Sequence, residues 1–526
     1  MGKLAFPLSV RRFVWRAGVC CALVAPAAIC RAGVVEQARP ADGFVDSMGT
    51  NIHTAFGGNF VTNPQGVANV LNDIGIRYVR DIPTTPDRLN ALTAATGVKV
   101  CVISQYYWDY ANAFDVKNFD AFWAQVKQVN NVGWLELPNE PQNFDNYSDA
   151  LHAWTIKLYD AARADATFAR TPLVSCSVYY PTPSLADLAP YLDYGNIHSY
   201  PKIDGSPSNL PAYIAYARSV TGDKPIIATE TGYHNAYNAS NNSGISEVAS
   251  AKYLPRLYLE HFNAGVVKTF NYELINSFND DTYTNGEAHF GLVRTDLSYK
   301  PAAYALKNLI TLLKDPGPSF TPTPLNYTIT SPASDLQHTL LQKRDGTYWL
   351  ALWQDVLSYD PVAHQDLVVD PVSVKLSFNG VPVVLAETYR PTTSADMAGS
   401  VTAAQLVNVA VNDQVTLVHL RLAAPGDLNA DGIIDNTDVA TFFHHQGQQV
   451  PLDGGWALGD FDRDGRVGFI DFQLLEHNFG VSQYTPELQA RAAAFIAANV
   501  PEPGAVAPLL ALLVALGAGR RRARLT

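Results

Sequence analysis

Two short stretches decide the expected fold: residues 135–143, LELPNEPQN, and residues 225–234, PIIATETGYH. In each, an apolar run typical of a β-strand leads into a polar loop, which begins near Glu140 in the first stretch and near Glu230 in the second. The spacing of about 90 residues fits roughly three strand–helix units of a (β/α)8 barrel, whose active sites lie at the carboxyl ends of the strands. The sequence therefore predicts a barrel that brings two carboxylates to one face.

Strand and helix patterns alternate throughout residues 33–317. Amphipathic stretches such as 119–129, 149–164 and 247–262 have apolar residues three and four positions apart, which is typical of helices. The strand candidates are 46–52, 78–82, 98–104, 133–138, 173–178, 195–200, 225–229 and 267–274. Alternating strands and helices favour a parallel sheet, and eight such units favour closure into a (β/α)8 TIM barrel of the α/β class.

Three motifs follow the fourth, sixth and seventh predicted strands: Asn139-Glu140-Pro141, His198-Ser199-Tyr200-Pro201 and Thr229-Glu230-Thr231-Gly232. Together they resemble the pattern of glycoside hydrolase clan A, and the resemblance covers roughly the first three hundred residues. It implies a retaining glycosidase in which Glu140 is the acid/base and Glu230 is the nucleophile. In such enzymes the two carboxyl groups lie about 5–5.5 Å apart, so that one protonates the leaving oxygen while the other attacks the anomeric carbon.

The same resemblance implies roles for three neighbouring side chains. Asn139 would hold the sugar 2-hydroxyl, and Tyr200 would hydrogen-bond the nucleophile. Arg80, at the end of the second predicted strand, would keep Glu230 ionised. A nearby arginine lowers the pKa of a carboxylate, whereas a drier setting would raise the pKa of the acid Glu140.

Further candidates for substrate contact lie at the predicted strand ends. Many clan members have a sugar-stacking tryptophan after the eighth strand, but here Tyr272 or Glu273 would face the sugar. His53 and His198 are each either scaffold histidines or substrate contacts. For Tyr233, stacking on a pyranose face and ordinary loop packing remain alternatives. The same alternatives apply to Tyr106, Tyr107, Trp108, Tyr179 and Tyr180.

Three residues of the predicted strands have a structural interpretation. Glu136 lies four residues before Glu140, and a structural, hydrogen-bonded carboxylate is favoured over a catalytic one. Cys101 and Cys176 lie in non-neighbouring strands, whose Cα atoms are seldom close enough for a disulfide. Two buried thiols are therefore expected.

Residues 318–424 change character after a proline-rich boundary. Short alternating runs are separated by turns such as Asp345-Gly346 and Asn379-Gly380, which predicts an antiparallel β-sandwich. The strand candidates are 327–329, 339–341, 348–353, 374–378, 383–389 and 415–420. A scaffold role for this region is favoured over sugar binding.

Two acidic loops follow, each built around a glycine that permits a sharp turn, Gly432 in the first and Gly465 in the second. The expected ligands are Asp427, Asn429, Asp431, Asp435 and Asp438 in the first loop and Asp460, Asp462, Asp464 and Asp471 in the second. Calcium requires hard oxygen ligands at this spacing. The paired layout of residues 425–482 resembles a type I dockerin, which implies two structural Ca²⁺ ions and a cohesin-type protein as one candidate partner. Residues 483–499 are expected to form a spacer helix, and no cofactor is expected for catalysis.

Both ends of the chain resemble processing signals. Residues 1–32 combine basic residues, an apolar run and small residues, as a signal peptide does. Residues 500–526 contain Pro-Glu-Pro, a short apolar run and an arginine cluster, which resembles a PEP-CTERM sorting tail that is handled by a sorting machinery. We expect an exported protein at the cell surface, in the extracellular space or in a matrix.

The net charge of the whole chain is −12, and these two ends are basic. Residues 1–32 hold five basic and no acidic side chains, and residues 500–526 hold four arginines and one glutamate, so the remainder carries −20. Nucleic acid is therefore an unlikely partner.

Two functions from different classes remain at this stage. The first is a secreted retaining glycoside hydrolase that cleaves β-glycosidic bonds of a poly- or oligosaccharide. The second is a non-catalytic, calcium-dependent protein for glycan binding or cell-surface assembly. Because both carboxylates and the partners Asn139, Tyr200 and Arg80 are present, the sequence favours the enzyme.

Overall fold

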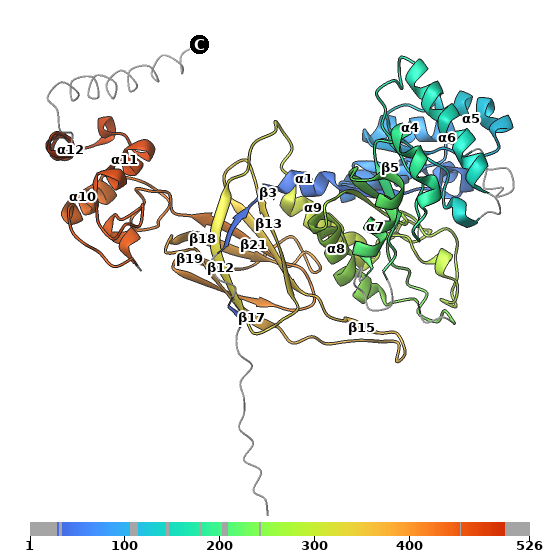
Figure 1. Cartoon of the computed structure of the whole chain (residues 1–526). Helices are drawn as coiled ribbons and strands as arrows, with labels where there is room; N and C mark the ends of the chain where they lie inside the picture. The colour runs from blue at the N-terminus through green and yellow to red at the C-terminus, as the bar shows by residue number, and fades with distance from the viewer. Residues whose placement is uncertain are drawn as a thin grey trace, which may run out of the picture.

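The computed structural model describes residues 29–30, 34–105, 114–143, 147–178, 180–201, 209–240, 243–452 and 454–499. Figure 1 shows a part rich in helices in blue and green, a part rich in strands in yellow and orange, and a small helical part in red. Most of the predicted signal peptide, the predicted sorting tail and the aromatic residues Tyr106, Tyr107, Trp108 and Tyr179 lie outside the described residues. No helix in the described ranges is long and apolar enough to cross a membrane.

Eight parallel strands form the sheet of the first part, in the order β8-β7-β6-β5-β4-β11-β10-β9. They are β4 (Met48–Asn51), β5 (Tyr78–Asp81), β6 (Lys99–Ile103), β7 (Val132–Glu136), β8 (Leu173–Val174), β9 (Gly195–His198), β10 (Ile226–Thr231) and β11 (Val266–Asn271). All eight predicted strands are confirmed. An isolated parallel bridge joins Val174 of β8 to Tyr194, which directly precedes β9, so the sheet nearly closes into a barrel.

Helices connect the strands and cover the outside of this barrel (Figure 1). They are α1 (Ala41–Asp46), η1 (Thr54–Phe56), α2 (Asn59–Thr62), α3 (Pro64–Ile74), α4 (Pro86–Thr96), η2 (Val116–Asn118), α5 (Phe119–Val126), η3 (Pro141–Asn143), α6 (Tyr147–Ala164), η4 (Pro183–Tyr191), α7 (Leu210–Thr221), α8 (Glu247–Asn263), η5 (Gly286–Ala288) and α9 (Pro301–Leu313). Local sequence sets their ends: Asn63 caps α3 by accepting a hydrogen bond from the Gly66 amide, and Gly75 ends it in a left-handed conformation. Apolar side chains of strands and helices share one core, for example Val79, Leu135 and Leu306.

Two mainly antiparallel sheets form the second part. The first contains β1 (Ile29–Cys30), β2 (Val34–Gln37), β12 (Pro324–Ser331), β17 (Val372–Ser377) and β20 (Leu406–Val411). The second contains β3 (Arg39–Pro40), β13 (Leu336–Gln342), β14 (Tyr348–Gln354), β18 (Val383–Tyr389), β19 (Met397–Ala404) and β21 (Thr416–Leu422). Side chains from both sheets meet in one core. Residues 34–40, which the expected boundaries place with the barrel, pair with strands of these sheets.

A hairpin of β15 (Tyr359–Asp360) and β16 (Gln365–Asp366) reaches from the two-sheet part to the barrel (Figure 1). Its neighbour Ser358 donates its backbone amide to the hydroxyl of Tyr253 in α8, at 2.6 Å. Arg256 of α8 pairs with Asp355 at 2.5 Å. The barrel and the two sheets are therefore linked through α8.

The last part, here called the helical module, spans residues 425–499. Its elements are α10 (Asn436–His445), η6 (Gly455–Leu458), α11 (Phe469–Asn478), η7 (Val481–Gln483) and α12 (Pro486–Asn499). Phe442, Phe472 and Phe495 lie in one core, which also includes Val384 of the two-sheet part. Helix α12 is thus a structural part of the module and not the spacer expected from its sequence.

Candidate active site

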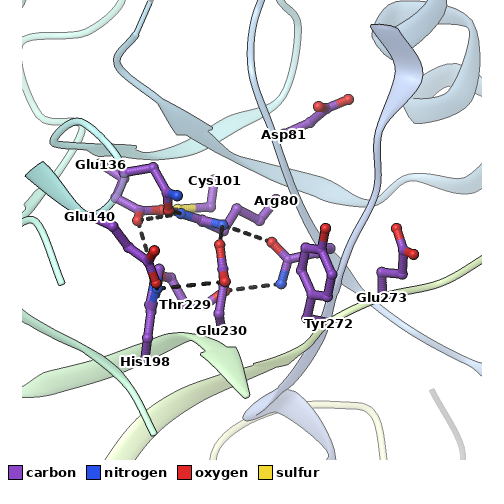
Figure 2. Close-up of polar contacts among 12 residues, drawn as sticks. Arg80, Asp81, Cys101, Glu136, Glu140, His198, Thr229, Glu230, Tyr272 and Glu273 are labelled. Carbon is purple, nitrogen blue, oxygen red and sulfur yellow. Dashed lines mark hydrogen bonds and ion pairs between the residues drawn. The ribbon is translucent and has the colours of Figure 1, made fainter. Parts of the chain in front are cut away.

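The predicted catalytic residues meet at the carboxyl ends of the parallel strands (Figure 2). Glu140 follows β7, His198 ends β9, and Glu230 is the second-to-last residue of β10. One carboxylate oxygen of each glutamate and one ring nitrogen of His198 all lie within 4.8 Å of one another. The barrel therefore brings together side chains that are far apart in the sequence.

Arg80 of β5 is fully buried beneath this group. Its guanidinium donates to both carboxylate oxygens of Glu136, at 2.6 and 2.8 Å, and to Oε1 of Glu230 at 2.6 Å. It also donates to the side-chain oxygens of Asn139, at 2.8 Å, and Asn51, at 2.9 Å. Burial acts to lower the pKa of Arg80, but the charges of Glu136 and Glu230 outweigh burial and raise it. A permanent positive charge therefore lies against Glu230.

Glu230 is held at both oxygens. Arg80 contacts Oε1, and the hydroxyl of Tyr200 donates to Oε2 at 2.8 Å. Burial and the charge of Glu230 raise the pKa of Tyr200 well above its ordinary value, so this hydroxyl keeps its proton. The side chain of Glu230 is 10% exposed, which leaves only a small part of the carboxylate open to a ligand.

Glu140 is the more open of the two carboxylates, with 30% of its side chain exposed. Its backbone has a φ of 42°, a left-handed conformation that is rare for a residue other than glycine and is common at functional sites. Oε2 accepts a hydrogen bond from Asn143 at 3.0 Å, and Oε1 lies 2.8 Å from Nδ1 of His198. Burial acts to raise the pKa of Glu140, but the hydrogen bond and charge of His198 outweigh burial and lower it. The pKa of Glu140 is thus shifted in the direction opposite to the raised value expected from the sequence.

His198 is poised to share a proton with Glu140. Its Nε2 lies 3.0 Å from the hydroxyl of Thr229. The same hydroxyl lies 2.9 Å from a carboxylate oxygen of Glu136 and 2.8 Å from the side-chain oxygen of Asn196, and both of these oxygens can only accept. Because Thr229 has one hydrogen and faces two acceptors, it accepts from His198, and Nε2 carries a proton. Nδ1 is then the atom that shares a proton with Glu140. Burial acts to lower the pKa of His198, but the neighbouring carboxylates outweigh burial and raise it.

Glu136 is fully buried and lies beneath the two catalytic candidates, where it contacts Arg80. It accepts hydrogen bonds from Arg80, Asn196 and Thr229, in agreement with the structural interpretation of its sequence position. No separate role was predicted for Asn196 or Thr229 from the sequence. Alternation along a strand could have found Asn196, because a residue two positions before His198 faces the same side of β9.

Tyr272 and Glu273 differ in their placement. Glu273 is buried, lies 3.2 Å from Nε2 of His53 and accepts a hydrogen bond from Ser277 at 3.0 Å. Burial acts to lower the pKa of His53, but its hydrogen bond and charge interaction with Glu273 raise it. Tyr272 is half-buried, and its ring centroid lies 6.5 Å from that of Tyr200. Of these residues, Tyr272 lies next to the catalytic pair, and Figure 2 shows Glu273 further away.

Tyr233 does not join the carboxylate cluster. Its ring packs against Tyr253 of α8, with the centroids 5.4 Å apart.

Cys101 and Cys176 are buried free thiols, as predicted, and burial raises the pKa of Cys176 to about 12.

The two acidic loops of the helical module share a backbone conformation. Ala430 and Arg463, at matched positions, have φ values of 56° and 65°, and Gly432 and Gly465 have values of 86° and 85°. The glycines are needed here because other residues rarely adopt this conformation. The two loops therefore repeat in structure as well as in sequence.

The second loop contains the clearer cation-binding arrangement. One carboxylate oxygen from each of Asp460, Asp462 and Asp464 lies within 4.8 Å of the others. Asp460 is 1% exposed, and its Oδ1 accepts no hydrogen bond from the described residues. Asp471 accepts hydrogen bonds from three backbone amides, and burial raises its pKa.

In the first loop, backbone amides fix the carboxylates. Asp427 is buried and accepts hydrogen bonds from the amides of Asp431 and Gly432, at 3.2 and 3.0 Å. Asp438 is buried and accepts from the amides of Leu428 and Asp435, at 2.9 and 3.0 Å. Burial raises the pKa of both aspartates, and the negative charges of neighbouring aspartates raise it further. The other expected ligands, Asn429 and Asp435, each accept a backbone hydrogen bond within the loop.

No family model matches the chain, and no curated protein matches it. Among solved structures, a family 39 glycoside hydrolase from Xanthomonas axonopodis pv. citri is 14% identical, with a TM-score of 0.47, over 74% of this chain and 96% of that one. A monomeric β-xylosidase from Caulobacter crescentus CB15 is 14% identical, with a TM-score of 0.48, over 73% and 98%. A β-1,3-glucanosyltransferase mutant from Rhizomucor miehei, in complex with laminaritriose, is 18% identical, with a TM-score of 0.39, over 48% and 96%. Structural similarity at such low sequence identity does not define the reaction that this protein catalyses. Its function must therefore be inferred from the geometry of its own candidate active site.

Proposed function

We propose that the protein is an exported retaining glycoside hydrolase that cleaves β-glycosidic bonds in an oligo- or polysaccharide. The observation that carries this proposal is the short distance between Glu140 and Glu230: one carboxylate oxygen of Glu140 lies within 4.8 Å of one carboxylate oxygen of Glu230. Retaining enzymes hold their carboxyl groups about 5–5.5 Å apart, whereas inverting enzymes need about 6.5–9.5 Å to admit a water molecule.

Glu230 is the nucleophile in this proposal. Arg80 places a positive charge against its carboxylate, and the contacts from Arg80 and Tyr200 fix both of its oxygens before a sugar arrives. Its carboxylate attacks the anomeric carbon, the bond to the leaving oxygen breaks, and a covalent glycosyl–enzyme bond forms. Asn139, which is held by Arg80, lies at the end of β7 in the position expected to contact the sugar 2-hydroxyl.

Glu140 is the acid/base. It gives the leaving oxygen the proton that it shares with Nδ1 of His198, at 2.8 Å. As a carboxylate, it then takes a proton from the water that attacks the glycosyl–enzyme, which restores the starting state. The hydrogen bond to His198 lowers the pKa of Glu140, and the neighbouring carboxylates raise the pKa of His198, so the two groups compete for the proton that they share.

Calcium binding belongs to the same proposal. The oxygen set of each acidic loop suits Ca²⁺, and Oδ1 of buried Asp460, which accepts no hydrogen bond from the described residues, is suited to bind a cation. Bound Ca²⁺ would supply the counter-charge that these carboxylates lack and so stabilise the module. The ends of the chain support export to the cell surface or matrix, and a cohesin-type protein is the partner that the paired loops suggest.

The direct test is hydrolysis by the purified protein. A panel of 4-nitrophenyl β-glycosides and β-linked polysaccharides, with the α-linked glycosides as matched controls, should include at least one β-linked substrate that is cleaved. Release of 4-nitrophenol and of reducing ends would be measured. Cleavage of α-linked members alone, or of none, would refute the proposal.

A further inference from the structure

A row of aromatic rings leads from the nucleophile to the surface of the barrel. Tyr200 donates its hydroxyl to Glu230, and its ring centroid lies 6.5 Å from that of Tyr272. Tyr272 meets His53 edge to face at 5.3 Å, and His53 stacks on Phe56 at 4.6 Å with the ring planes 17° apart. The row connects the reacting centre to a residue that the sequence did not single out.

Phe56 is the most exposed of these four rings. It closes η1, which follows β4 at the same strand-end face as the two catalytic glutamates, and its side chain is 53% exposed. The next residues, Gly57 and Gly58, have positive φ values of 82° and 52°. A Cβ built on either glycine would meet no atom within 4 Å, so the space beside these two glycines is open.

The support beneath Phe56 is fixed before any ligand binds. His53 is buried and lies 3.2 Å from Glu273. Thr54 donates its amide and hydroxyl to Asp81, at 2.9 and 2.6 Å. A platform that is already ordered loses little conformational entropy when a ligand stacks on it.

The row lies on one particular side of the reacting centre. Figure 2 shows Glu140 and Tyr272 on opposite sides of Glu230. The acid/base Glu140 must face the leaving group, so the side beyond Glu230 belongs to the sugars that stay bonded to the nucleophile. These sugars form the glycone of the substrate.

We propose that Phe56 is a stacking platform for the second sugar of the glycone. This inference rests on the proposed function and narrows its substrate class to glycans with at least two β-linked sugars on the non-reducing side of the cleaved bond. A flat aromatic side chain offers a large apolar face to the C–H groups of a sugar ring. Binding energy from this remote sugar helps to position the reacting one, so that shorter glycones react more slowly.

The test compares two substrates with the same leaving group: a 4-nitrophenyl β-monosaccharide and the 4-nitrophenyl β-disaccharide of the same sugar, in the gluco and xylo series. The measured quantity is the ratio of kcat/KM for the disaccharide to that for the monosaccharide. In the wild type this ratio should be well above one. Phe56→Ala should lower it about tenfold, the size of a lost aromatic contact.

Tyr304→Ala is the matched control, because Tyr304 is a similarly exposed aromatic residue, 52% exposed, on the outer helix α9. It should leave the ratio unchanged. Phe56→Trp should keep the ratio, and Phe56→Leu, which keeps the bulk but loses the flat face, should lower it even if Phe56→Ala unfolds.

The outcomes separate the two proposals. A wild-type ratio near one, or a ratio that neither Phe56→Ala nor Phe56→Leu changes, would overturn the platform and leave the hydrolase in place. An equal loss of kcat/KM on both substrates would assign Phe56 a purely structural role and also overturn it. Failure to hydrolyse either series and every β-linked substrate of the panel would refute the proposed function and the platform with it.

Discussion

Glu230→Ala is expected to lower kcat by roughly four to six orders of magnitude, the loss seen when a covalent nucleophile is removed. The fold should survive, because Arg80 keeps its two contacts with Glu136 and so remains a paired buried charge. The measurements are kcat on an activated aryl glycoside and the thermal unfolding temperature of the same preparation. A variant that unfolds, or one that keeps more than a hundredth of the wild-type rate, would contradict the assigned role.

Glu140→Ala is the contrasting variant for the same prediction. General acid–base assistance contributes roughly 10²–10⁴-fold, and an activated leaving group needs less of it. Azide should therefore partly restore the turnover of Glu140→Ala on an activated substrate and yield a glycosyl azide with the configuration of the substrate. If Glu230→Ala instead gave this azide product, the two roles would have to be exchanged.

Removal of calcium is expected to unfold the helical module while the barrel stays folded. At a calcium concentration one hundred times the Kd, each site stabilises the folded state by about 2.7 kcal/mol. For a module of this size, 1 kcal/mol corresponds to about 4–8 °C, so loss of two sites should lower its transition by about 20 °C or more. Calorimetry of the whole chain, with calcium or with chelator, would resolve the module from the barrel.

Matched variants make this measurement specific. Asp460→Asn removes the negative charge of the carboxylate whose Oδ1 accepts no hydrogen bond from the described residues. This variant should reduce the increase in the unfolding temperature of the module that calcium causes. Asp345→Asn, which changes an exposed turn of the two-sheet part, should leave the response unchanged. A module transition that is equal in calcium and in chelator would exclude the two calcium sites.

The barrel could be predicted because each of its strands has a strong local signal. Buried parallel strands are short apolar runs, and the intervening helices carry the three-and-four pattern. Strand β19 was not predicted, because nearly all of its residues are exposed and it has no alternating pattern. The pairing of residues 34–40 with the two sheets depends on contacts with strands some three hundred residues later, which no local pattern encodes.

The candidate site was predictable up to the ends of the strands. Glu140, His198 and Glu230 come at the ends of predicted strands, which places them at one face of the barrel, but strand periodicity stops where the chain turns. Gly232, with a φ of 141°, redirects the chain directly after β10, and the ring of Tyr233 packs against Tyr253 of α8. The lowered pKa of Glu140 depends on His198, which lies 58 residues away in sequence, and only the folded structure gives their distance.

The most direct test of the central claim is the configuration of the first-formed product. Hydrolysis of a β-linked substrate would be followed by ¹H NMR from the first minutes, before mutarotation mixes the anomers. Because one oxygen of Glu140 and one of Glu230 lie within 4.8 Å, closer than the roughly 6.5–9.5 Å that inverting enzymes use to admit an attacking water, we predict that the β-anomer appears first. Initial release of the α-anomer would show inversion and contradict the account.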